Sequence, residues 1–114
     1  MSHLSILPTV LRHEELLVQA LQDLSLPVEH GGELRGFADQ REPVLVRAQL
    51  PQGLWLGWAR QPDGCLALVG DLQRLGRSTS LQQLIGQITR RYAAHLAVRD
   101  LQRDWSGARV ELVS

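Results

Sequence analysis

The sequence predicts an α+β fold, an antiparallel sheet of about five to six strands with two helices packed on one face, in the order β-α-β-β-β-β-α-β. Three observations support it. Helical periodicity occurs near the start and over the last third of the chain. Between these stretches, alternating segments are joined by turns too short for parallel crossovers. The 114 residues, 44% of them apolar, suit a single domain, 1–114, with its own core.

The first quarter of the chain predicts a strand, a helix and two further strands. Residues 1–9 alternate weakly between apolar and polar side chains, as in a short strand. Residues 13–24 place their apolar side chains on one helical face. Pro27 then prevents the helix from continuing. Residues 28–37 predict two short strands around a turn at Gly31 and Gly32.

The middle of the chain contains the clearest hairpin. Residues 39–43 predict a polar loop, and residues 44–50 alternate as a half-buried strand. Residues 54–60 and 65–70 predict two strands joined by a turn that contains Pro and Gly. Gly57, inside the first of these strands, indicates either a bulge or the close approach of another segment. We favour a packed helix over a ligand as that segment.

A long helix is predicted after a mostly polar linker at residues 71–79. Ser80 and Gln83 can form a capping box at its start. Gly86 weakens the helix interior by about 1 kcal/mol relative to Ala, which indicates that the backbone closely approaches the sheet. Over residues 107–112, a glycine suited to ending a helix precedes an alternating final strand.

The long helix carries two apolar stripes. The first, suited to a core, consists of Leu81, Leu84, Ile85, Ile88, Tyr92 and Leu96. The second, rotated by roughly 130° at the helical period, consists of Ala94, Val98, Leu101 and Trp105. A bend or break near His95 would pack the second stripe on another part of the core, and this is the favoured interpretation. A straight helix would instead present it as an exposed ridge flanked by arginines, suited to a protein partner.

The charges are unevenly distributed although the formal net charge is zero. Residues 1–71 contain five arginines and nine acidic residues (−4), whereas residues 72–114 contain seven arginines and three acidic residues (+4). Nucleic-acid binding through the arginine-rich C-terminal half is therefore an alternative function. Zero net charge and the lack of interleaved exposed aromatics disfavour it. The arginines concerned are Arg74, Arg77, Arg90 and Arg91, extended by Arg99 and Arg103.

Residues with the spacing of a catalytic or metal site are not recognisable. The four histidines are dispersed and Cys65 is the single cysteine, so we expect no metal, no cofactor and a protein that is not an enzyme. Cys65 lies in an apolar run and is expected to be buried. Asp71, at a strand end, is the best candidate for a functional carboxylate, although a turn or capping role is preferred. Without a membrane-spanning segment or signal peptide, we expect a cytoplasmic protein.

Several short motifs occur in a characteristic order and spacing. They are Met1–Ser5, ELLVQALQDL at 15–24, Arg35-Gly36-Phe37, Gly57-Trp58, Val69–Asp71 and Arg91-Tyr92-Ala93. In this order the whole chain resembles the ycf thirty-five family, a plastid and cyanobacterial open reading frame of unknown function. The resemblance implies a photosynthetic source and supplies no catalytic residue. Ser25 stands where a helix-ending Gly is common in that family.

The leading functional hypothesis is a non-enzymatic accessory or adaptor protein of photosynthetic organisms that acts through contacts with an unidentified protein partner. The predicted partner-binding residues are Val98, Leu101, Trp105, Arg90 and Arg91. Nucleic-acid binding is the second hypothesis. The third is small-ligand binding between the sheet and the long helix, which would require a cavity near Gly57 and Gly86.

Overall fold

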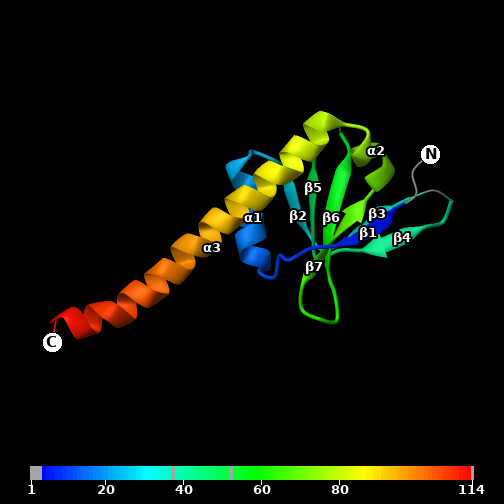
Figure 1. Ribbon diagram of the computed structural model, residues 1–114. Coiled ribbons are helices and arrows are strands. Elements are labelled where there is room, and N and C mark those ends of the chain that lie inside the picture. The colour runs from blue at the N-terminus through cyan, green and yellow to red at the C-terminus, as the bar shows by residue number, and fades with distance from the viewer. Residues whose placement is uncertain (1–3, 37, 52, 114) are drawn as a thin grey trace.

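The structure, a computed structural model, describes residues 4–36, 38–51 and 53–113, apart from the side chains of residues 72, 75 and 104–113. Five strands form an antiparallel sheet in the order β1-β7-β6-β5-β2, and β3 and β4 form a separate two-stranded sheet (Figure 1). The predicted α+β class is confirmed. The elements are β1 (Ser5–Pro8), α1 (Glu14–Asp23), β2 (Val28–His30), β3 (Glu33–Arg35), β4 (Arg41–Pro43), β5 (Val46–Gln49), β6 (Trp55–Arg60), β7 (Leu66–Gly70), α2 (Leu72–Gly76) and α3 (Thr79–Val113).

The helices α1 and α3 cover one face of the five-stranded sheet, as predicted (Figure 1). Leu17 and Leu21 of α1 are fully buried against the inward side chains of the strands. The first apolar stripe of α3 belongs to the same core: three of its members are buried and three are partly buried. Burial of these side chains is the main source of stability, at about 1.5–3 kcal/mol for each large one.

The hairpin β3–β4 covers the opposite face of the sheet. Leu34 and Val44 are buried there against Val69. Gly57 lies beneath them, because Leu56 and Trp58 on either side of it point toward the helices. The register around Gly57 is regular, so it marks no bulge. The predicted close approach is present, but the approaching segment is this hairpin and not a helix.

Two predictions about this hairpin were wrong. Residues 28–30 and 33–35 are strands, as predicted, but β2 pairs with β5 and β3 pairs with β4. Gly31 and Gly32, with φ of 75° and 86°, redirect the chain from one sheet to the other. Residues 41–43, within the predicted loop, form β4. Its side chains are mostly exposed because it lies on the surface, so no apolar alternation revealed it.

The segment before α3 also differs from the prediction. The expected linker contains the short helix α2. Ser78, and not Ser80, caps α3, since its Oγ accepts a hydrogen bond from the N–H of Leu81 at 3.2 Å. Residues 78–80 all carry hydroxyl groups suited to an N-cap, so local propensity alone does not choose among them.

The helix α3 is continuous from Thr79 to Val113 and projects far beyond the globular part (Figure 1). The bend near His95 and the strand at residues 108–112 were therefore wrong predictions, and Gly107 does not end the helix. A strand there would have no neighbouring sheet edge, whereas a helix satisfies its own backbone hydrogen bonds. The projection gives a radius of gyration of 16.5 Å, against about 13 Å expected for a compact chain of this length.

Candidate functional site

The projecting part of α3 begins where its contacts with α1 end. His95 Nε2 lies 2.6 Å from Asp23 Oδ2, and Arg99 Nη1 donates a hydrogen bond to Glu15 Oε1 at 3.0 Å. Residues 100–103 are all exposed or half-exposed. Arg99 therefore marks the end of the anchored part of the helix.

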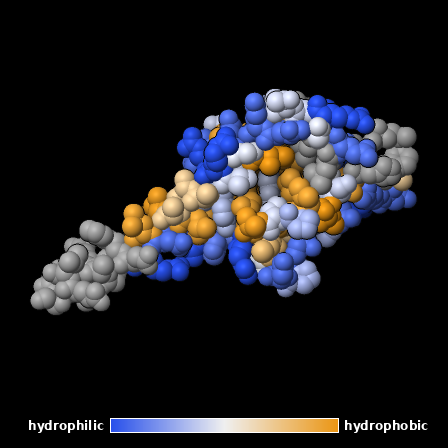
Figure 2. Space-filling view, in the orientation of Figure 1, coloured by the Kyte–Doolittle hydropathy of each residue, from blue (hydrophilic) through white to orange (hydrophobic). Residues whose placement is uncertain are grey.

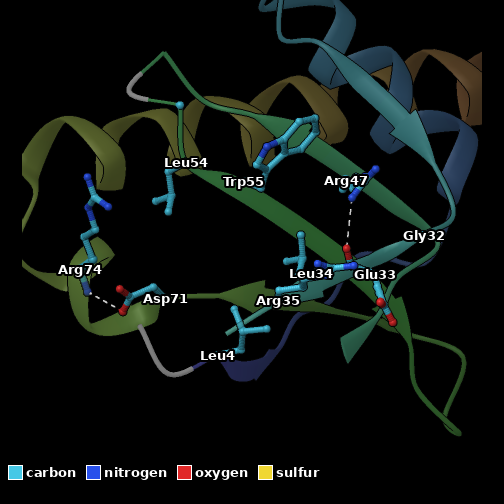
Figure 3. A pocket seen from close by; sticks show the side chains of 11 residues that line it. Leu4, Gly32, Glu33, Leu34, Arg35, Arg47, Leu54, Trp55, Asp71 and Arg74 are labelled. Carbon is cyan, nitrogen blue, oxygen red and sulfur yellow. Dashed lines mark hydrogen bonds between the residues drawn. The ribbon is translucent and has the colours of Figure 1, made fainter. Parts of the chain in front are cut away.

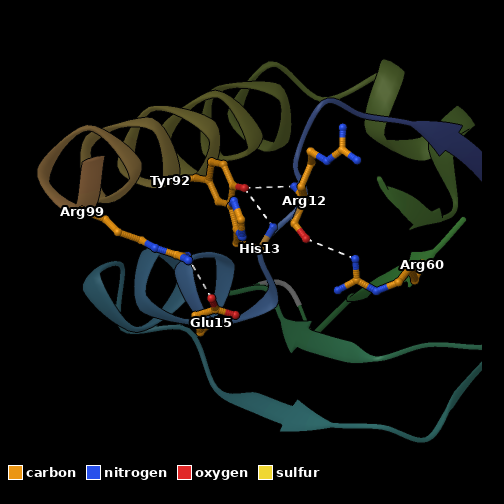
Figure 4. A network of polar contacts seen from close by, with 6 residues as sticks. All are labelled: Arg12, His13, Glu15, Arg60, Tyr92 and Arg99. Carbon is orange, nitrogen blue, oxygen red and sulfur yellow. Dashed lines mark hydrogen bonds and ion pairs between the residues drawn. The ribbon is translucent and has the colours of Figure 1, made fainter. Parts of the chain in front are cut away.

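A buried tyrosine anchors α3 more deeply (Figure 4). The hydroxyl oxygen of Tyr92 accepts hydrogen bonds from the backbone N–H groups of Arg12 at 2.9 Å and His13 at 3.0 Å. Arg60 Nη1 of β6 donates to the carbonyl oxygen of Arg12 at 3.2 Å. These bonds connect α3, the start of α1 and the sheet, so the direction in which α3 projects is fixed by the core.

The ion pair between Glu15 and Arg99 lies at the surface. The pKa of the Glu15 carboxyl is lowered from its ordinary value of 4.5, first by a hydrogen bond with its own backbone. Burial opposes this shift, and the positive charges of Arg99 and His13 and the hydrogen bond from Arg99 lower the pKa further. Because the Glu15 side chain is 63% exposed, we assign the pair a small contribution to stability.

The second apolar stripe of α3 is exposed along its described part. Val98 and Leu101 expose 52% and 65% of their surface, and Ala94 is also exposed. We term these three residues the α3 ridge. Figure 2 shows apolar side chains gathered on this stretch of α3. The side chain of Trp105, the fourth predicted member, lies outside the described residues.

Two exposed arginines flank the start of the α3 ridge. Arg90 and Arg91 lie about 50° to either side of it at the helical period. Within the described part of the chain, neither guanidinium makes an ion pair or hydrogen bond. The structure thus brings four of the five predicted partner-binding residues onto one exposed surface of α3.

The arginines of the nucleic-acid hypothesis do not form one patch. Arg74 belongs to α2, whereas Arg90 lies about 16 Å along α3 from the start of that helix. Arg99 is engaged by Glu15. A continuous phosphate-binding surface of these residues is therefore not seen.

The glycines of the small-ligand hypothesis do not share a cavity. A Cβ atom at Gly57 would lie 2.5 Å from Val44 Cγ1, on the face of the sheet opposite α3. At Gly86 a Cβ atom would meet Arg90 Nη1 at 3.3 Å and not the sheet. The prediction that α3 approaches the sheet at Gly86 was wrong, because that glycine does not lie on the core-facing stripe.

A cavity of about 650 Å³ lies elsewhere, between the hairpin β3–β4, the sheet and the start of α2 (Figure 3). We term it the hairpin cavity. Its main lining residues are Leu34, Arg35, Arg47, Trp55, Asp71 and Arg74. Sequence reasoning missed it, because it forms only when β3 leaves the main sheet. The available signal was an arginine and a tryptophan on neighbouring strands of one hairpin.

Arg47 is the most constrained charge in the hairpin cavity. Its Nη2 atom lies 2.5 Å from Glu29 Oε2, and Nη1 donates to the carbonyl oxygen of Glu33 at 3.1 Å. Its guanidinium carbon lies 5.0 Å from the centroid of the Trp55 ring, within cation–π range. Its Nε atom is buried without a hydrogen-bond partner in the described part of the chain.

Asp71 is buried and caps α2. Its Oδ1 atom accepts a hydrogen bond from the backbone N–H of Arg74 at 3.1 Å. This is the capping role preferred from the sequence. The carboxylate also lines the hairpin cavity, so it remains available to a ligand there.

The described residues contain neither a cluster of metal ligands nor a helix that could cross a membrane. No three His, Cys, Asp or Glu side chains in this part of the chain lie close enough together to hold a metal ion. No described helix has the length and apolar character needed to cross a membrane. Cys65, expected to be buried, is half-buried at the end of the turn between β6 and β7.

Comparison with known proteins yields one family. The family model described as a protein of unknown function (DUF1257) matches residues 20–111. The matched segment includes the last four residues of α1, the α3 ridge and the lining of the hairpin cavity except Leu4. No curated protein and no solved structure matches the chain.

Proposed function

The chain belongs to the DUF1257 family, whose function is unknown, and from its own geometry we propose that it is a non-enzymatic accessory or adaptor protein. It binds a protein partner through the α3 ridge. The exposure of Val98 and Leu101 on a helix that projects from the core is the observation that carries this proposal. The resemblance to the ycf thirty-five family adds a photosynthetic organism as the source, and we propose the cytoplasm as the compartment.

The energetics favour a partner on the α3 ridge. Burying the exposed parts of Val98 and Leu101 would contribute on the order of 1 kcal/mol each. The anchoring bonds of Tyr92 and Arg99 hold the helix in place before binding. Little conformational entropy is therefore lost on association, and the modest apolar area is used efficiently.

Charge defines the chemistry of the partner. Arg90 and Arg91 flank the ridge without intramolecular partners in the described part of the chain, so an apolar surface bordered by carboxylates is complementary to it. A second copy paired ridge to ridge would present further arginines and no carboxylate from its own α3 ridge. We therefore assign the surface to an acidic partner of a different sequence.

Site-specific photocrosslinking in a native extract tests this assignment. A photoreactive amino acid replaces Val98 in one variant and Val10 in a matched control, since Val10 is an exposed valine outside α3. We expect a crosslinked partner from position 98 only, identified by mass spectrometry as having an acidic surface. Adding Arg90→Ala and Arg91→Ala should reduce its yield.

Three results would contradict the proposal. They are equal crosslinking from both positions, no crosslink from position 98, and a crosslink from that position only to a second copy of this chain.

A further inference from the structure

The hairpin cavity has an excess of available positive charge. Three arginines line it against two acidic residues: Glu33 Oε1 lies 3.6 Å from Arg41 Nη1, and Asp71 accepts the capping hydrogen bond of α2 through Oδ1. Within the described residues, the guanidiniums of Arg35 and Arg74 make no ion pair or hydrogen bond. Guanidinium groups bind phosphate oxygens through paired, charge-assisted hydrogen bonds. The charges of the cavity therefore suit an anionic group such as phosphate.

The same cavity offers a flat apolar surface. Trp55 is half-buried and lines the cavity together with leucine side chains, while Arg47 lies over its ring at 5.0 Å (Figure 3). Two contacts to glutamate residues fix Arg47 in this position. An arginine held beside an indole forms a preorganised site for a planar ring, which can stack on either group.

A buried polar atom of Arg47 indicates that holding this side chain against Trp55 costs folding free energy. The Nε–H of Arg47 has no acceptor among the described residues although it is excluded from solvent. Such unsatisfied donors are rare in folded proteins and call for a specific explanation. A guanidinium held against Trp55 in order to receive a ligand supplies one.

We propose that the hairpin cavity binds a nucleotide, whose base stacks beside Trp55 and Arg47 and whose phosphate is bound by a guanidinium of the lining, that of Arg35 on β3 or that of Arg74 on α2, which lie on different sides of the cavity (Figure 3). The cavity volume of about 650 Å³ falls within the ordinary range for small-ligand sites. Asp71 can accept a hydrogen bond from an amino group on the base. The nucleotide is either free or one unit of a single-stranded nucleic acid, since both present the same ring and phosphate.

Isothermal titration calorimetry on the full chain tests this proposal. The probes are adenosine 5′-monophosphate, adenosine, ribose 5-phosphate and a short single-stranded RNA. We expect the monophosphate to bind more tightly than either of its fragments. If the RNA binds and the monophosphate does not, the ligand is one unit of a single-stranded nucleic acid. If the monophosphate binds and the RNA does not, the ligand is a free nucleotide.

Variants locate the binding. Trp55→Leu should weaken it at least about fivefold, since stacking on an aromatic ring typically contributes about 1–3 kcal/mol per base. Arg35→Ala with Arg74→Ala should have a similar or larger effect and leaves the core intact, because both side chains are exposed. Arg90→Ala with Arg91→Ala removes the same charge from α3 and should leave binding unchanged.

The proposal is overturned if neither the monophosphate nor the RNA binds the folded wild-type chain. It is also overturned if Arg35→Ala with Arg74→Ala binds as tightly as wild type, or if the α3 variant loses affinity equally. None of these results bears on the photocrosslinking from position 98, so the two proposed sites succeed or fail separately.

Discussion

Gly57→Ala tests the packing of the hairpin β3–β4 on the sheet. The added Cβ atom would lie 2.5 Å from Val44 Cγ1 and 3.0 Å from Leu34 Cδ1, whereas carbon atoms in contact prefer about 3.5–4.0 Å. Relieving both overlaps requires the hairpin to move by about 1 Å, and overpacking of this kind typically costs about 1–3 kcal/mol. Alanine recovers part of this by restricting the unfolded chain, by about 0.4–1 kcal/mol. We expect a net loss of about 1–2 kcal/mol in the free energy of unfolding.

Urea denaturation followed by circular dichroism measures this loss. Adding Val44→Ala removes the closest contact, so the double variant should lose less stability than the sum of the two single variants. Gly86→Ala is the matched control: its Cβ atom meets only the end of the Arg90 side chain, and alanine in a helix should stabilise it by about 0.5–1 kcal/mol. A Gly57→Ala variant as stable as wild type, or additive effects with Val44→Ala, would refute the reasoning.

Three further predictions concern α1 and its contacts. Ser25 has a φ of 58° in the turn that ends α1. Its replacement by Gly should raise the free energy of unfolding by about 1 kcal/mol, and a decrease would contradict the left-handed geometry. Tyr92→Phe leaves two backbone N–H groups at the start of α1 without their acceptor and should cost about 1–3 kcal/mol in urea denaturation; an unchanged midpoint would contradict these bonds. Glu15 should titrate below 4.5 in carboxyl NMR spectra. Because its folded pKa is the lower one, its stabilisation is present above the unfolded pKa and is lost as pH falls through the folded pKa. Arg99→Gln should raise the folded value partway toward 4.5, and titration at or above 4.5 in wild type would contradict the assignment.

Elements with a strong periodic pattern were predictable from the sequence. The first stripe of α3 and the hairpin of β6 and β7 were confirmed because each element buries one face, which imposes its period on the sequence. Strand pairing was less predictable. Residues 28–30 and 33–35 lie close enough in sequence to pair with each other. In the structure β2 instead pairs with β5, and β3 pairs with β4.

The prediction of a C-terminal strand was wrong for a related reason. Alternation at residues 108–112 describes side chains, but a strand also needs a neighbour for its backbone hydrogen bonds. Because α3 has already left the sheet, no edge is near (Figure 1). The pattern of apolar and polar residues in a segment does not indicate how far that segment lies from a sheet edge.

The two candidate sites differ in how far the sequence revealed them. The α3 ridge was predicted because the apolar residues of α3 move to another face of the helix while keeping the helical period. Only the structure showed that Val98 and Leu101 are exposed. The hairpin cavity could not be predicted, because Leu34 and Arg35 come to line it with Arg47 and Trp55 only when the hairpin β3–β4 folds over the sheet.

The yield of the partner crosslink from position 98, compared between wild type and Leu101→Ser, tests the central claim most directly. A substitution at an exposed position changes the free energy of unfolding by no more than about 0.5 kcal/mol, so the variant should remain folded while the crosslink yield falls sharply. An unchanged yield would contradict binding through the α3 ridge. A loss of stability of about 2–5 kcal/mol, typical of a truncated core leucine, would show instead that Leu101 is buried.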